Sequence, residues 1–223
     1  DKENEYYTKY TANVFRGIYT TSEEATAEYE KARELVARFI NGKPEEVIFT
    51  RNTSESINLV AYSLHPKLVV STIMEHHSNF VPWQQMSTMR IWNCSKEGRL
   101  DIADLDTLVT KETNLVAVTA LSNVLGTINP IKQIVRTVKR LNSSCLVLVD
   151  AAQAVPHMPV DVSDWGADFV AFSSHKMLGP TGVGVLWGKR ELLETMKPFN
   201  YGGEMIAEVH VDKTVFKSAP HKF

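Results

Sequence analysis

Short apolar runs alternate with amphipathic segments along most of the chain. Helical periodicity or helix-start signals mark residues 21–41, 51–64, 102–109 and 131–141. Runs rich in Val, Ile, Leu and Phe predict strands at residues 45–50, 67–72, 89–94, 114–121, 145–150, 168–174 and 182–187. The strands are nearly continuously apolar, which is typical of strands covered on both faces. The alternation therefore predicts an α/β fold with a mainly parallel sheet and helices on both faces.

Local signals predict where two of the helices begin. Thr21 and Glu24 fit a capping box, and Thr53 and Ser54 are candidate caps of the helix in 51–64. The pattern becomes less regular after residue 200, and we expect residues 201–223 to form a mobile loop region.

Composition narrows the class of protein. With 24 basic and 26 acidic residues the net charge is −2, which gives no reason to expect a nucleic acid or a membrane as partner. No apolar run is long enough to span a bilayer, and the charged start "DKENEYYTKY" is no signal peptide. The two cysteines, Cys94 and Cys145, form no CxxC motif and are expected to be inert core thiols. A cytoplasmic enzyme or binding domain is the expectation.

Polar residues gather where the predicted strands end. Ligands of open parallel sheets bind beyond the carboxyl ends of the strands. We therefore expect a site there, formed by Thr53, Ser54, Glu75, His76, His77, Asn123, Asp150, Gln153, Ser173, Ser174, His175 and Lys176.

These side chains suit one kind of ligand. Hydroxyls at a helix start bind anions such as phosphate. The Asp150 carboxylate can hold a positive charge, and the Lys176 amine can form an imine. Pyridoxal 5'-phosphate (PLP) has a phosphate, a basic ring nitrogen and an aldehyde, and its enzymes use a lysine and an acidic partner for the ring nitrogen.

Other interpretations stay open at this point. Lys176 is also explained as a solvated surface charge, and Asp150 as a turn residue. Adjacent His76 and His77 lack a third ligand nearby, so no metal site is expected. The glycine-rich segment at 179–189 fails the phosphate-loop pattern, because Val183 replaces its first glycine.

Seven segments resemble one family, in the order in which that family has them. They are "NVFRGIYTTSEEATAEYEKAR", "IFTRNTSESINLVA", "MEHHSNFVPWQ", "ALSNVLGTINPI", "VDAAQAVPHMPVDV", "DFVAFSSHKMLGPTGVGVLWGK" and "YGGEMI". The resemblance is to SUF-type cysteine desulfurases and their relatives, the selenocysteine lyases, which are class V aminotransferase-type enzymes. It implies a fold-type-I PLP-dependent transferase domain over residues 1–223.

The resemblance also implies a role for each site residue. Lys176 would bind PLP covalently, and His76 would stack on its ring; both would be catalytic. Arg16 would lie near the substrate entrance. The remaining cofactor contacts would come from Asp150 at the ring nitrogen, Gln153 and Asn123 near the ring oxygen, and Thr53, Ser54, Ser173 and His175 at the phosphate.

The resemblance further implies partners and missing parts. The substrate would be cysteine or selenocysteine, and a homodimer and a sulfur-acceptor protein would be the partners. The family's N-terminal segment and small C-terminal domain, which supplies the nucleophilic cysteine, have no counterpart in the sequence. We therefore expect a PLP-binding large domain that acts in iron–sulfur cluster assembly. A selenocysteine lyase or another class V PLP enzyme is the alternative within the same class. A non-catalytic cofactor-binding or dimerisation scaffold is the alternative of another class.

Overall fold

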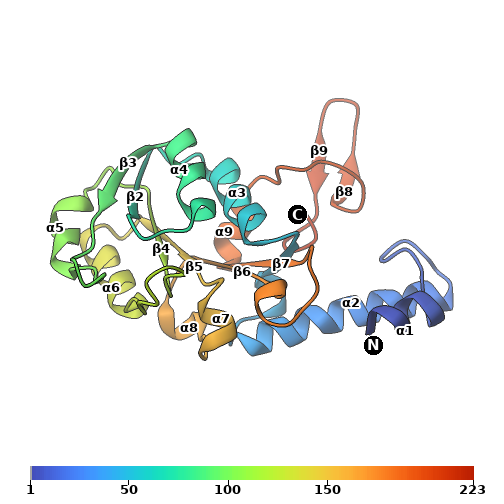
Figure 1. Ribbon diagram of the computed structural model, residues 1–223. Helices are drawn as coiled ribbons and strands as arrows, with labels where there is room; N and C mark the ends of the chain where they lie inside the picture. Colours follow the sequence, from blue (N-terminus) through green and yellow to red (C-terminus); the bar gives the residue numbers. More distant parts are fainter. Residues whose placement is uncertain (1) are drawn as a thin grey trace.

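A twisted sheet forms the centre of the molecule in the computed structural model, which describes residues 2–223 (Figure 1). In these residues the sheet has seven strands in the order β1-β7-β6-β5-β4-β2-β3. All its strands run parallel except β7, which is antiparallel to both of its neighbours. The strands are β1 (Val47–Thr50), β2 (Leu68–Thr72), β3 (Thr88–Trp92), β4 (Leu115–Thr119), β5 (Leu146–Asp150), β6 (Phe169–Ser173) and β7 (Gly184–Gly188).

Helices cover both faces of the sheet, as the alternation of segments predicts. One face packs against α2, α5, α6, α7 and α8, and the other against α3, α4 and α9. The helices are α1 (Lys2–Lys9), α2 (Thr20–Phe39), α3 (Thr53–Leu64), α4 (Val81–Met86), α5 (Leu105–Leu108), α6 (Ile131–Leu141), α7 (Ala154–His157), α8 (Val162–Trp165) and α9 (Arg190–Thr195). Figure 1 shows α1 lying along the outer part of α2, away from the sheet.

Strand β5 shows why the strands read as continuously apolar. Val147 and Val149 point into the core on one face, and Leu148 points into the core on the other. All three are fully buried. A strand that is covered on both faces has no solvent side, so the usual alternation of polar and apolar residues disappears.

Two predicted helix starts are wrong by one or two residues. Helix α2 begins at Thr20, and its cap is Tyr19, which makes no side-chain capping bond, so Thr21 lies inside the helix. Helix α3 is capped by Asn52, whose side chain accepts a hydrogen bond from the Glu55 amide (2.9 Å). Thr53 therefore opens the helix and leaves its hydroxyl free for other contacts.

The tail is more regular than its sequence indicates. Residues 206–216 form an antiparallel hairpin of β8 (Ile206–Val209) and β9 (Thr214–Phe216), which projects from the body in Figure 1. The expectation of an irregular loop region is therefore wrong for these residues. None of the helices formed by residues 2–223 is both long and apolar enough to cross a membrane.

Candidate active site

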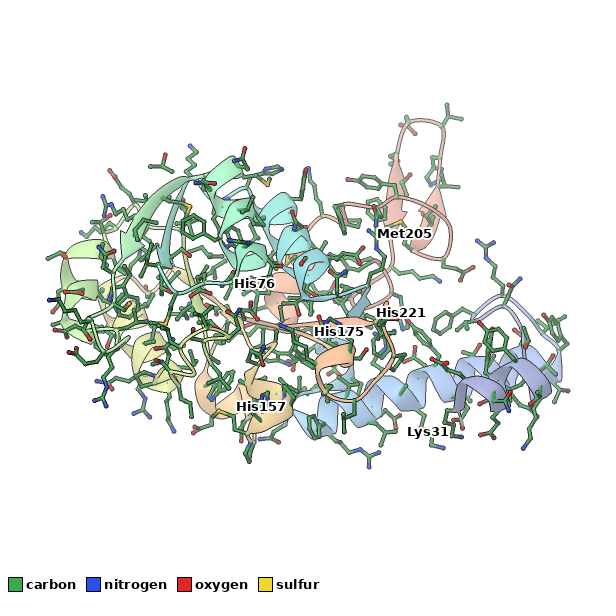
Figure 2. The ribbon with its side chains drawn as sticks, in the orientation of Figure 1. Lys31, His76, His157, His175, Met205 and His221 are labelled. Atoms are coloured by element: carbon green, nitrogen blue, oxygen red, sulfur yellow. The ribbon has the colours of Figure 1, made fainter. Side chains whose placement is uncertain are left out.

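A cavity of about 280 Å³ lies at the carboxyl edge of the parallel strands. Residues from four segments meet there: the start of α3, the turn after β2, the end of β5 and the end of β6. Figure 2 shows His76 and His175 in the central part of the molecule, away from α1 and the β8–β9 hairpin. The lining consists of Asn52, Thr53, Ser54, His76, Ser78, Asp150, Ala152, Ser173, His175 and Lys176.

The start of α3 supplies hydrogen-bond donors to this cavity. The hydroxyl oxygens of Thr53 and Ser173 are 2.6 Å apart, and the Thr53 amide donates to Ser173 Oγ (2.7 Å). Since one hydroxyl donates to the other, one hydroxyl hydrogen of the pair remains free. The Ser54 amide, also in the first turn, has no acceptor among the described residues. Free donors at the positive end of a twelve-residue helix form an anion site.

Asp150 is a buried carboxylate at the end of β5, only 4% exposed. Its Oδ1 accepts a hydrogen bond from the Ala152 amide (2.9 Å). Burial raises the pKa of Asp150 above its ordinary value, while the Ala152 hydrogen bond and the positive charges of Lys176 and His76 lower it. The hydrogen bond and the positive charges thus offset only part of the effect of burial. A cationic group bound in the cavity would stabilise the charged form of Asp150 further.

Lys176 follows β6 in a single turn of 3-10 helix, Ser174–Lys176, and its side chain is half-buried. The chain then folds back, because the Gly179 amide donates to the Ser174 carbonyl (2.9 Å). A Cβ on Gly179 would lie 2.9 Å from Ser174 Cβ, so this return requires glycine. The tight return leaves the Lys176 amine at the edge of the sheet, in the same cavity as Asp150.

Ser78 and Asn52 line the cavity without being predicted as site residues. Ser78 Oγ lies 2.6 Å from Ser54 Oγ and 3.0 Å from His76 Nδ1, so it joins the His76 turn to helix α3. The sequence offers a weak signal for Ser78, which stands two residues after His76 in "EHHSN".

Six predicted site residues lie outside the cavity lining: Glu75, His77, Ser174, Asn123, Gln153 and Arg16. Asn123 is exposed in the turn after β4, and Gln153 is half-buried at the start of α7. Arg16 is exposed and forms an ion pair with Glu204, which joins the N-terminal loop to the segment before β8.

The two thiols differ from each other. Cys145 is buried just before β5, and burial raises its pKa to about 12, so it behaves as the predicted inert core thiol. Cys94 is only half-buried and lies beyond β3, in an isolated bridge to Leu100, so it is not a core residue. Neither lines the cavity. Among residues 2–223, no three His, Cys, Asp or Glu side chains are placed to hold a metal ion.

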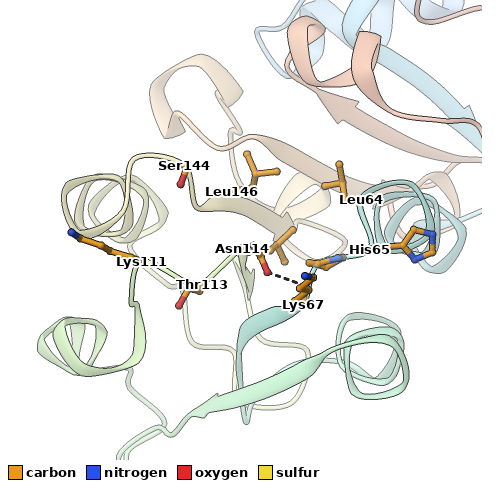
Figure 3. Close-up of a pocket in the computed structure, with 10 residues that line it drawn as sticks. Leu64, His65, Lys67, Lys111, Thr113, Asn114, Ser144 and Leu146 are labelled. Carbon is orange, nitrogen blue, oxygen red and sulfur yellow. Dashed lines mark hydrogen bonds between the residues drawn. The ribbon is translucent and has the colours of Figure 1, made fainter.

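A second cavity, of about 470 Å³, opens at the opposite edge of the sheet (Figure 3). It lies at the amino ends of β2, β4 and β5, beside Asn114, whose Oδ1 accepts a hydrogen bond from the Lys67 amide (2.9 Å). None of the predicted site residues lines it.

The fold and the polar edge of the sheet define an α/β domain with a candidate ligand site, and comparison with known proteins assigns its family. Residues 1–223 match the family described as Aminotransferase class-V, and the chain belongs to this family. A probable cysteine desulfurase of Streptomyces coelicolor is 49% identical over 239 residues, and a cysteine desulfurase of Yersinia pseudotuberculosis is 47% identical over 236 residues. Each alignment covers 100% of this chain, but 57% and 58% of the two relatives.

Solved structures agree with this assignment. The apo structure of a cysteine desulfurase from Thermococcus onnurineus superposes with a TM-score of 0.93 at 41% identity and covers 99% of this chain. The cysteine desulfurase CsdA from Escherichia coli gives 0.88 at 35% identity, over 98% of this chain. This chain spans 57% of each of these structures, so it corresponds to little more than half of the relatives' length.

Proposed function

We propose that this chain is the PLP-binding part of a cysteine desulfurase, which converts L-cysteine to L-alanine and passes the sulfur to an acceptor thiol. The observation that carries the proposal is the meeting of Lys176, Asp150 and the α3 start in one cavity. The names of the similar proteins support the choice of cysteine.

The residues of the cavity fit PLP in three respects. The free donors at Thr53, Ser54 and Ser173 match a phosphate. The Asp150 carboxyl matches a protonated ring nitrogen, and the Lys176 amine matches the aldehyde. His175 adds an exposed donor beside the phosphate site.

Each residue then has a stated task in the proposed reaction. Bound PLP would act as the electron sink for the bonds to the substrate Cα. Asp150 would keep a proton on the ring nitrogen by a charge-assisted hydrogen bond. Lys176 would hold the cofactor at rest and move a proton to and from the substrate Cα. His76 would lie against the ring and restrict its movement.

Three further assignments belong to the proposal. Gln153 and Asn123 would contact the ring oxygen, and Arg16 would lie near the substrate entrance. A homodimer and a sulfur-acceptor protein, working in iron–sulfur cluster assembly, would be the partners. Neither Cys94 nor Cys145 lines the cavity, so we propose that the thiolate that takes the sulfur lies outside residues 2–223.

The chemical balance of the reaction defines the assay. The C–S bond of cysteine breaks, its sulfur bonds to the acceptor thiolate as a persulfide, and protonation of the remaining carbon skeleton gives alanine. Alanine release from L-cysteine should be measured in the full-length protein with PLP and dithiothreitol. We expect turnover in the wild type and none in Lys176→Ala. PLP binding without alanine release would instead support a cofactor-binding scaffold.

A further inference from the structure

Glu75 fastens the turn that carries His76 to two strands of the sheet. Its Oε1 accepts hydrogen bonds from the Thr72 hydroxyl (2.6 Å) and the Thr119 amide (2.8 Å), and its Oε2 accepts one from Asn79 Nδ2 (2.6 Å). Thr72 ends β2 and Thr119 ends the neighbouring strand β4. One carboxyl group therefore binds both strand ends and the far end of the turn.

The orientation of Asn79 is fixed by a fourth residue. Trp83 Nε1 donates to Asn79 Oδ1 (3.1 Å), and an indole N–H can only donate. The oxygen of Asn79 must therefore face Trp83, which is fully buried, and its NH₂ must face Glu75. The Thr119 amide is also a donor only. Glu75 thus faces two groups that cannot accept a hydrogen bond from it.

Of the three hydrogen-bond partners of Glu75, only the Thr72 hydroxyl can act either as donor or as acceptor. Burial raises the pKa of Glu75 to about 8, and the negative charge of Asp150 contributes in the same direction, while the three hydrogen bonds lower it. Asp150, from β5, is the charged group that faces Glu75 from a packed element. A protonated Glu75 can donate to Thr72 Oγ1 and still accept from Thr119 and Asn79. The contacts therefore persist in both protonation states.

The turn that Glu75 closes holds His76. The Asn79 amide donates to the His76 carbonyl (2.8 Å), and the Ser78 amide donates to His76 Nδ1 (3.1 Å). The side-chain hydrogen bond from Asn79 to Glu75 joins the two ends of the segment 75–79. It therefore encloses both of these contacts of His76. His76 is exposed and lines the cavity, so its position depends on the turn that carries it.

We propose that Glu75 is the positioning residue for His76, and that it fixes the imidazole in the cavity by clamping residues 75–79 to the ends of β2 and β4. This inference rests on the proposed function only in taking PLP as the ligand of the cavity. The clamp, meaning the hydrogen bonds of Glu75 with Thr72, Thr119 and Asn79, is independent of that function.

A pair of substitutions tests the clamp. Glu75→Gln keeps the shape of the side chain but introduces an NH₂ group. In either orientation of the new amide, this group meets a donor, the Asn79 NH₂ or the Thr119 amide. Adding Asn79→Asp restores the match, because the introduced carboxylate can accept from both Trp83 and the new amide at position 75. Glu112→Gln, at an exposed position, is the matched control.

Two measurements read the outcome. The first is ¹⁵N-histidine NMR of the chain without PLP, with the His76 signals assigned from His76→Gln. The second is the Kd for PLP. In Glu75→Gln the turn must shift to relieve the unpaired donor, so we expect displaced His76 signals. We also expect a Kd for PLP raised about fivefold, because the displaced imidazole loses roughly 1 kcal/mol of contact with the cofactor. The double variant should return both to wild-type behaviour, and Glu112→Gln should change neither.

Specific results would overturn the proposal. Unmoved His76 signals in Glu75→Gln would do so, as would a folded double variant that fails to restore them. Thr72→Val removes one of the three donors and is the milder variant, for use if Glu75→Gln does not fold. It should move the same signals, and their constancy would also overturn the clamp. If the wild type fails to bind PLP, the proposed function fails, but the NMR measurement still decides the clamp.

Discussion

The hydroxyl oxygens of Thr53 and Ser173 lie 2.6 Å apart, although 120 residues separate them in the sequence. The contact joins the start of α3 to the end of β6 and thereby places the helix start beside the segment that carries Lys176. Strand β7 makes this approach possible. Its first residue, Gly184, pairs with both Thr50 and Ser173 and lies directly against the backbone of Asn52.

Gly184→Ala should damage the anion site. The added Cβ would lie 2.5 Å from Asn52 Cα, so the cap of α3 must move. We expect a loss of roughly 1–3 kcal/mol in the free energy of unfolding, as for other overpacked sites, together with weaker PLP binding. Chemical denaturation and PLP titration measure the two effects. Gly202→Ala, where the added Cβ meets no atom within 4 Å, is the control. Equal behaviour of the two variants would refute this account of β7.

Asp150→Asn should weaken cofactor binding while keeping the shape of the residue. The amide oxygen can still accept from the Ala152 amide, but the charge that faces the cavity is gone. A charge-assisted hydrogen bond contributes about 1.5–3 kcal/mol, so we expect the Kd for PLP to rise about 10- to 100-fold. Asp106→Asn, which breaks an exposed ion pair with Arg140, should leave the Kd unchanged. An unchanged Kd in Asp150→Asn would remove this residue from the site.

The buried carboxyl of Glu75 should make stability depend on pH. Because its pKa is raised from 4.5 to about 8, the folded protein binds more protons than the unfolded chain between these values. The stability contributed by this group is therefore full below pH 4.5 and is lost as the pH rises toward 8.

Denaturation at a series of pH values tests this dependence. Relative to Glu75→Gln, which cannot titrate there, the wild type should lose a few kcal/mol across the interval, at most about 5. A difference between the two proteins that does not vary with pH would show that Glu75 is already ionised at low pH.

The two thiols should have no part in sulfur transfer. Cys145 is fully buried with its pKa raised to about 12, so it should resist a thiol reagent until the protein unfolds, whereas half-buried Cys94 should react sooner. Residues 1–223 alone should release negligible sulfide from cysteine, because neither thiol lines the cavity. Rapid sulfide release that Cys94→Ser or Cys145→Ser abolishes would show that the nucleophile has been misassigned.

The class of fold could be predicted because each strand is apolar on both faces and each is separated from the next by a helical or turn signal. Val147, Leu148 and Val149 show this double burial. The gathering of His76, Asp150 and Lys176 was also predictable, since the carboxyl ends of parallel strands share one edge. All three line the same cavity.

Other features depend on contacts that a local pattern does not contain. Asn52 and Thr53 both have side chains that can cap a helix, and the structure shows that Asn52 caps α3. The Thr53 hydroxyl instead contacts Ser173, which is distant in sequence, so a local pattern does not reveal this contact. The ion pair of Arg16 with Glu204 joins residues 188 positions apart. The β8–β9 hairpin was missed because its turn contains no glycine or Asn-Gly signal.

The most direct test of the account is the identity of the lysine that binds PLP. The protein should be incubated with PLP, reduced with borohydride and digested, and the labelled peptide sequenced by mass spectrometry. We predict that the pyridoxyl group is on Lys176. Lys139 and Lys189 are internal controls, because both form ion pairs with Asp168 at the opposite edge of the sheet. A label on either of them, or no label on Lys176, would contradict the proposed site.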